Sequence, residues 1–83
     1  MELTYGRYIK VEELLQLQQP LSEGPEHDEM LFIIIHQVYE LWFKQILHEL
    51  EKLKSSFQEG ERGKSLHTLK RIRSILKVLV SQG

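Results

Sequence analysis

Residues 25–57, with the sequence PEHDEMLFIIIHQVYELWFKQILHELEKLKSSF, decide the fold because they predict one long α-helix. After its first residue the stretch holds no Gly or Pro, the two residue types that interrupt helices most strongly. Pro25 suits a first helical position, where its missing N–H would have no intrahelical partner. Glu26, Asp28 and Glu29 then place negative charge at the positive end of the helix dipole.

From residue 31 to residue 43 this predicted helix is apolar on nearly every side. The apolar residues form two stripes at helical spacing: Leu31, Ile35, Val38 and Trp42 in one, and Phe32, Tyr39, Phe43 and Ile46 in the other. A surface helix usually carries a single apolar stripe, whereas a helix that is apolar all round usually lies inside a larger core. We therefore expect an inner helix.

One imidazole, that of His36, stands in the middle of this apolar belt. Phe32 precedes it by four residues, so the two side chains share a helix face. His36 can be a structural histidine whose ring nitrogens bond to neighbouring groups, as buried polar groups usually do. It can equally be a site residue, since a neutral imidazole among aromatic rings offers one directed hydrogen bond to a ligand. The helix itself leaves both interpretations open.

Length and composition limit the remaining possibilities. The chain has 83 residues, 41% of them hydrophobic and 28% charged, which predicts one small globular domain rather than a disordered segment. The absence of cysteine excludes a disulfide framework and a thiolate metal site. The apolar run from Met30 to Ile35 is too short to cross a bilayer. We expect a soluble, cytoplasmic chain with no membrane partner.

The net charge of −1 hides an uneven distribution. Residues 1–63 carry six basic and twelve acidic residues, whereas residues 64–83 carry five basic residues and no acid. A basic segment can bind nucleic acid, but these cations lie on the polar side of an amphipathic helix with no aromatic residue between them. We expect a solvated face that pairs with the acidic helix before it, and no nucleic-acid partner.

The other segments predict an all-α fold. Residues 1–9 form a short arm in which Tyr5 and Tyr8 flank Gly6, and residues 10–19 predict a short amphipathic helix. Two Gly- or Pro-containing loops precede and follow the long helix. Residues 64–81 predict a third helix, antiparallel to the second, with an apolar stripe formed by Leu66, Leu69, Ile72, Leu76, Leu79 and Val80.

Motifs for metal chemistry are incomplete. His48-Glu49 begins like the zinc-protease pattern, but Lys52 replaces the second histidine. The Glu-x-x-His spacing of carboxylate di-iron bundles does not occur. His27 and Asp28 stand at a charged helix start, and His48 and His67 lie on polar faces. We therefore predict no metal site built by this chain.

The apolar surface exceeds what three helices of these lengths can cover. The central helix offers two apolar faces, and the short first helix with one face of the third helix cannot bury both. We expect the chain either to self-associate or to be a piece of a longer protein. One functional interpretation is thus a non-catalytic helical oligomerisation module.

Two segments carry a resemblance to a known family. LTYGRYIKVEELLQLQQPLS (residues 3–22) and PEHDEMLFIIIHQVYELWFKQILHEL (residues 25–50) resemble the N-terminal part of the tryptophan 2,3-dioxygenases. The resemblance implies an all-α heme protein assembled as a homotetramer. It also implies oxidation of L-tryptophan by O₂ to N-formylkynurenine, a step of tryptophan catabolism in the kynurenine pathway.

The resemblance assigns roles to individual residues. His36 matches the catalytic distal-pocket histidine that hydrogen-bonds the indole N–H, and Phe32 matches the aromatic residue that packs against the indole. Ile33, Ile34 and Ile35 match the pocket-lining turn between them. An N-terminal arm that reaches a neighbouring subunit's active site is matched by Tyr5, Tyr8 and Ile9. The family's heme-iron ligand has no counterpart in the chain, so we expect the iron ligand to lie outside these residues and the chain alone to be inactive.

Overall fold

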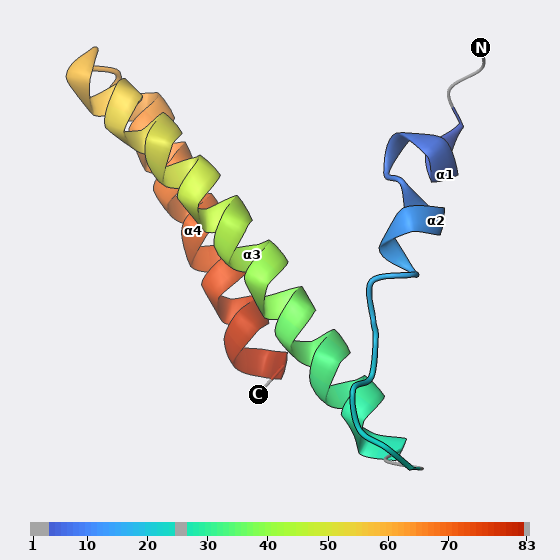
Figure 1. Cartoon of the computed structure of the whole chain (residues 1–83). Coiled ribbons are helices and arrows are strands. Elements are labelled where there is room, and N and C mark those ends of the chain that lie inside the picture. The colour runs from blue at the N-terminus through green and yellow to red at the C-terminus, as the bar shows by residue number, and fades with distance from the viewer. Residues whose placement is uncertain (1–3, 25–26, 83) are drawn as a thin grey trace. The chain divides into compact units, whose positions relative to one another are not determined.

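The computed structural model describes residues 4–24 and 27–82, and their regular structure is entirely helical. Four helices follow one another: α1 (Tyr5–Tyr8), α2 (Val11–Leu14), α3 (His27–Gln58) and α4 (Arg62–Gln82) (Figure 1). The predicted all-α class is confirmed. Pro25 and Glu26, predicted at the start of the long helix, lie outside the described residues. Within the described ranges no helix is long and apolar enough to span a membrane.

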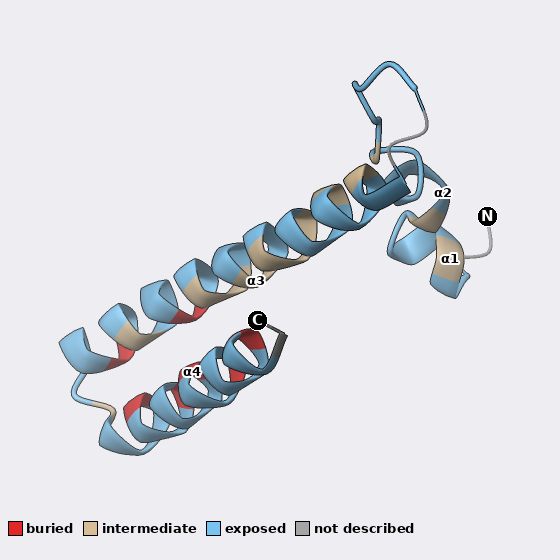
Figure 2. Cartoon of the chain, turned by 90° about the horizontal axis from the view of Figure 1, so that it is seen from below, coloured by how far each residue is buried: buried red, intermediate tan, exposed pale blue. Residues whose placement is uncertain are grey.

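The chain divides into two compact units, Met1–His36 and Gln37–Gly83, and α3 is continuous through the boundary between them. The second unit is an antiparallel helix pair, with α4 beside the C-terminal part of α3 in both views (Figures 1 and 2). The first unit holds α1, α2 and the first turns of α3.

A Schellman turn closes the helix pair. Gly60 has a φ of 72°, which a glycine adopts without the steric cost that a Cβ would add. Its N–H donates to the carbonyl of Phe57 at 3.1 Å, and the N–H of Glu61 donates to the carbonyl of Ser56 at 2.9 Å. These two bonds satisfy carbonyls that a helix end leaves open. The predicted loop over residues 58–63 is therefore a short, hydrogen-bonded reversal.

The buried side of α4 differs from the predicted stripe. Its buried residues repeat at spacings of three and four: Ser65, Thr68, Ile72, Ile75 and Leu79. Ile72 and Leu79 were predicted correctly. The prediction was wrong for the other members, because Leu66, Leu69, Leu76 and Val80 are exposed. Figure 2 shows the buried residues on the sides of α3 and α4 that face each other.

Hydroxyl side chains replace apolar ones near the turn for a physical reason. The hydroxyls of Ser65 and Thr68 donate to the carbonyls of Glu61 and Lys64, each at 3.0 Å, so neither is buried without a partner. Ser56 is buried on the opposing side of α3. Small side chains of this kind let two helices approach closely next to a tight turn. A search for apolar residues alone overlooks such positions.

The first unit contains two single-turn helices where the sequence predicts an arm and one helix over residues 10–19. Thr4 caps α1 by accepting the N–H of Arg7 at 3.3 Å. Lys10 has a left-handed φ of 56°, which separates α1 from α2. After Leu14 the side-chain amides of Gln18 and Gln19 donate to the carbonyls of Leu14 and Gln16. The backbone bonds there are of the tighter three-residue kind, from Gln16 to the Glu13 carbonyl and from Leu17 to the Leu14 carbonyl, so the regular α-helix is limited to Val11–Leu14.

Candidate functional site

His36 and Phe32 form a pair on one face of α3. Their ring centroids lie 4.2 Å apart with the planes tilted by 34°. The Nδ1 atom of His36 lies 2.7 Å from the carbonyl oxygen of Phe32. The predicted proximity of these two side chains is therefore present, and one imidazole nitrogen has a backbone partner.

This backbone bond fixes the tautomer of the neutral imidazole. A carbonyl oxygen only accepts hydrogen bonds, so Nδ1 of His36 must carry the proton and donate it. In the neutral ring Nε2 then has no proton and acts as an acceptor. Because the helix carbonyl occupies Nδ1, the atom that His36 offers to a ligand is the acceptor Nε2. An acceptor of this kind suits a ligand N–H rather than a ligand carbonyl.

The predicted isoleucines do not share one surface. Successive residues of an α-helix are rotated by about 100°, so Ile33 and Ile35 flank the side of His36 while Ile34 lies roughly 160° away from it. Ile33 is half-buried, and Ile34 and Ile35 are exposed. Of the three, Ile33 and Ile35 lie nearer to His36 around the helix than Ile34 does.

The Phe32–His36 face is open in this chain. Phe32 is 62% exposed, and His36 is exposed as well. The described residues do not cover this part of α3, so the position of His36 on an inner helix of a larger core stays a prediction. One turn further on, Tyr39 and Phe43 form a stacked pair with ring centroids 6.3 Å apart. The Phe32–His36 face therefore has no covering side chains from the described residues.

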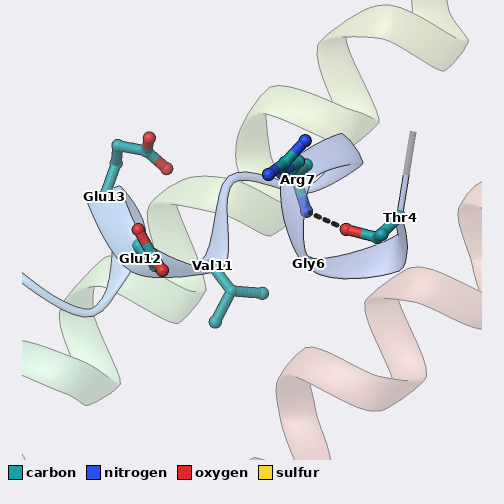
Figure 3. Close-up of a pocket in the computed structure, with 6 residues that line it drawn as sticks. All are labelled: Thr4, Gly6, Arg7, Val11, Glu12 and Glu13. Carbon is teal, nitrogen blue, oxygen red and sulfur yellow. Dashed lines mark hydrogen bonds between the residues drawn. The ribbon is translucent and has the colours of Figure 1, made fainter. Parts of the chain in front are cut away.

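The arm residues are also exposed. Tyr5 and Tyr8, three residues apart on α1, are 78% and 71% exposed. Ile9, the C-cap residue of α1, is 41% exposed. A hollow of about 410 Å³ opens beside α1 and α2 (Figure 3), lined by Thr4, Gly6, Arg7, Val11, Glu12 and Glu13. None of the predicted site residues lines this hollow.

An ion pair joins the buried Glu49 of α3 to the half-exposed Arg71 of α4. The sequence predicted pairing of the last helix's cations with the acidic helix before it, but not the burial of the acid. Glu49 is 3% exposed, and its Oε1 accepts from Nη1 of Arg71 at 3.2 Å and from the Gln45 amide at 3.0 Å. Nη2 of Arg71 donates to Nε2 of His67 at 3.1 Å. Burial raises the pKa of Glu49, but the bond to Arg71 and its charge, with Gln45 and Lys52, bring it below its ordinary value. The sequence signal was Glu49, an acidic residue at helical spacing, seven residues after Trp42 and seven before Ser56.

Comparison with known proteins identifies the family. A family model described as Tryptophan 2,3-dioxygenase matches residues 1–83. The chain belongs to the tryptophan 2,3-dioxygenase family. It is 58% identical over 80 residues to the tryptophan 2,3-dioxygenase of Herpetosiphon aurantiacus, a match that covers 96% of this chain and 31% of the relative.

Other tryptophan 2,3-dioxygenases show the same relation. The one from an Anaeromyxobacter species is 59% identical over 80 residues, covering 96% of this chain and 29% of that protein. The one from Dictyostelium discoideum is 46% identical over 86 residues, covering 94% and 22%. The chain therefore spans about three-tenths or less of the length of these relatives.

The residues described here do not by themselves fit a heme. The His36 face is exposed, and the described residues around it form no enclosed site that would surround a cofactor. A tryptophan 2,3-dioxygenase assembled with this chain would need its iron ligand and the remaining walls from other residues.

Proposed function

We propose that this chain supplies one wall of the tryptophan-binding site in a heme-dependent dioxygenase that converts L-tryptophan and O₂ to N-formylkynurenine. Membership of the tryptophan 2,3-dioxygenase family supports the reaction class. The observation that carries the residue assignment is the bond from Nδ1 of His36 to the Phe32 carbonyl. That bond leaves Nε2 as an acceptor, the complement of an indole N–H.

In this proposal His36 orients the substrate. Nε2 accepts the indole N–H, and the Phe32 ring, already 4.2 Å from the imidazole, packs against the indole face. Ile33 and Ile35 supply apolar surface on either side. The indole N–H is a very weak acid, so a neutral imidazole holds it by a hydrogen bond and does not remove the proton. His36 acts by positioning, which predicts a modest effect when it is replaced.

His36→Ala tests this role in the active enzyme, obtained by joining residues 1–83 to the portion of the Herpetosiphon relative beyond the match. We expect kcat/KM for tryptophan to fall roughly tenfold, because one hydrogen bond contributes about 0.5–1.5 kcal/mol. N-methylation of the indole removes the donor, so the His36→Ala enzyme should accept 1-methyltryptophan relatively better than the unmutated enzyme does. Steady-state kinetics with both substrates measure this.

His48→Ala is the matched control, since His48 is an exposed histidine on the same helix. It should leave both substrates unaffected. A loss of many orders of magnitude in His36→Ala, with heme and tryptophan still bound, would show that His36 is an obligatory base. No tryptophan oxidation by the unmutated enzyme would contradict the proposed function itself.

A second candidate function, a helical oligomerisation module, is favoured by the exposed apolar side chains of α3. Among the large apolar side chains of this helix, the largest exposed fractions are those of Leu31, Phe32, Leu41, Leu47 and Phe57. Burying a large apolar side chain contributes about 1.5–3 kcal/mol, so a few such contacts per chain are enough for micromolar association. The two candidates are compatible, since the family resemblance also implies a homotetramer.

We predict that the chain self-associates at micromolar concentration. Sedimentation velocity should detect species heavier than 9.9 kDa, and the double variant Leu41→Lys/Leu47→Lys should shift the distribution toward the monomer. Glu40→Lys/Glu51→Lys changes charge on the same helix without removing apolar surface, and should shift it less. A compact monomer throughout the concentration range would contradict this prediction.

A further inference from the structure

The loop before α3 is tied to the helix by one side chain. The carboxylate of Glu29 accepts the backbone N–H of Leu21 on Oε2 at 3.1 Å. It also accepts the N–H of Ser22, at 3.2 Å from Oε1 and 3.3 Å from Oε2. These bonds join positions seven and eight residues apart in the sequence. They account for the backbone donors of two consecutive loop residues.

The electrostatics of Glu29 agree with this geometry. The bond from the backbone N–H of Leu21 is the largest influence on the pKa of Glu29 and lowers it. Desolvation, the next largest, raises the pKa, and the bonds from Ser22 lower it, so that the pKa lies below its ordinary value. The carboxylate is therefore ionised at neutral pH. Hydrogen bonds to an ionised acceptor are shorter and stronger than neutral ones, so the loop is held by charge-assisted bonds.

Glu29 lies on the same face of α3 as the candidate site. Seven residues separate it from His36, which is two helical turns or about 10.5 Å along the axis. Phe32 lies between them, three residues after Glu29 and four before His36. Helical side chains lean toward the N-terminus, so Glu29 holds Leu21 and Ser22 beyond the N-terminal end of the Phe32–His36 face.

The same contact sets where the N-terminal arm leaves the helix. Residues 15–24, which follow the end of α2 at Leu14, contain no regular helix, and a connection of this kind has many conformations unless a contact ties it down. Anchoring it at Leu21 and Ser22 shortens the free part and limits the positions available to α1, which carries Tyr5 and Tyr8. We propose that Glu29 is a positioning residue for tryptophan binding, which fixes this loop at the edge of the His36 site. The inference rests on the proposed function.

Glu29→Gln tests the role, with Asp28→Asn as a matched control. Both substitutions remove one negative charge from the first turn of α3, but Asp28 makes none of the loop contacts among the described residues. In the active enzyme we expect Glu29→Gln to raise KM for tryptophan by about three- to tenfold, with kcat within about twofold. Glu29→Asp, which keeps the charge on a shorter side chain, should recover part of the loss, and heme absorbance should be unchanged in all three.

Hydrogen exchange on the chain gives a readout independent of activity. The amides of Leu21 and Ser22 should exchange faster in Glu29→Gln than in Asp28→Asn, by about three- to tenfold. Unchanged exchange, or faster exchange with a KM equal to that of Asp28→Asn, would overturn the proposal. Absence of tryptophan turnover in the unmutated enzyme would overturn the proposed function and the positioning role with it, while the exchange result would still show whether the Glu29 contact exists.

Discussion

Ile75→Ala is expected to lower the free energy of unfolding of the chain by about 2–4 kcal/mol, because it removes buried methyl groups and leaves a cavity between α3 and α4. Ile75 is 7% exposed and is one of three buried hydrophobic residues in the described part of the chain, with Ile72 and Leu79. A helix pair with so small an apolar core has few other contacts to offset the loss. Urea unfolding followed by circular dichroism at 222 nm measures the change.

Ser74→Ala is the control for this prediction. Ser74 is the neighbouring residue, lies on the exposed side of α4, and has its hydroxyl bonded to the Lys70 carbonyl. Alanine has a higher helix propensity than serine, so this variant should be neutral or slightly more stable. If Ile75→Ala and Ser74→Ala unfolded at the same urea concentration, the burial of Ile75 between α3 and α4 would be incorrect.

Arg71→Ala is the second large expected effect, a loss of about 1.5–3 kcal/mol at pH 7. The substitution leaves the buried carboxylate of Glu49 with the Gln45 amide as its hydrogen-bond donor among the described residues, at 3.0 Å. An unpaired buried charge is more costly than the pair was favourable. The half-exposed position of Arg71 keeps the expected loss below that of a fully buried pair. Arg73→Ala removes an exposed cation from the same helix and should change the unfolding free energy by less than about 0.5 kcal/mol.

The pH dependence distinguishes this mechanism from a simple loss of packing. Arg71 lowers the pKa of Glu49, so the stabilisation that the pair supplies is complete above the ordinary carboxyl value of 4.5 and is lost as pH falls through the lower folded-state pKa. Without Arg71, burial raises the pKa of Glu49, and protonation relieves the cost. The difference between the unmutated chain and Arg71→Ala should therefore shrink as pH falls from 7 toward 3. A difference independent of pH would contradict the role assigned to Glu49.

The sequence was sufficient for the helical class and for the long helix, because an uninterrupted apolar stretch has few alternatives. It was insufficient to predict which residues of α4 are buried against α3. Leucines at helical spacing suggested a buried stripe, whereas Ser65 and Thr68 occupy buried positions after satisfying their hydroxyls within the helix. The residues around Lys10 also departed from prediction, since a left-handed backbone at a lysine has no strong local signal.

For the candidate site, helical spacing and the family resemblance identified the pairing of Phe32 with His36, and the 4.2 Å ring contact agrees with it. The sequence indicated that the other helices cannot cover both apolar faces of the long helix, but not which part stays exposed, because an apolar pattern does not say which residues cover a surface. Glu29 was noted only as first-turn charge. Its contacts with Leu21 and Ser22 depend on how the preceding loop bends back, which no periodic pattern encodes.

The unequal lengths of the two long helices have a consequence for the order in which the molecule folds. α3 has 32 residues and α4 has 21, so antiparallel pairing from the Gly60 turn leaves the first turns of α3 without a partner from α4. Contacts next to a tight turn are local and form quickly, whereas an unpaired helix end is only marginally stable. We expect the pairing of α3 with α4 to begin next to Gly60, and the turns that carry Phe32 and His36 to become ordered last. These turns would then also be the first part of the helix to open.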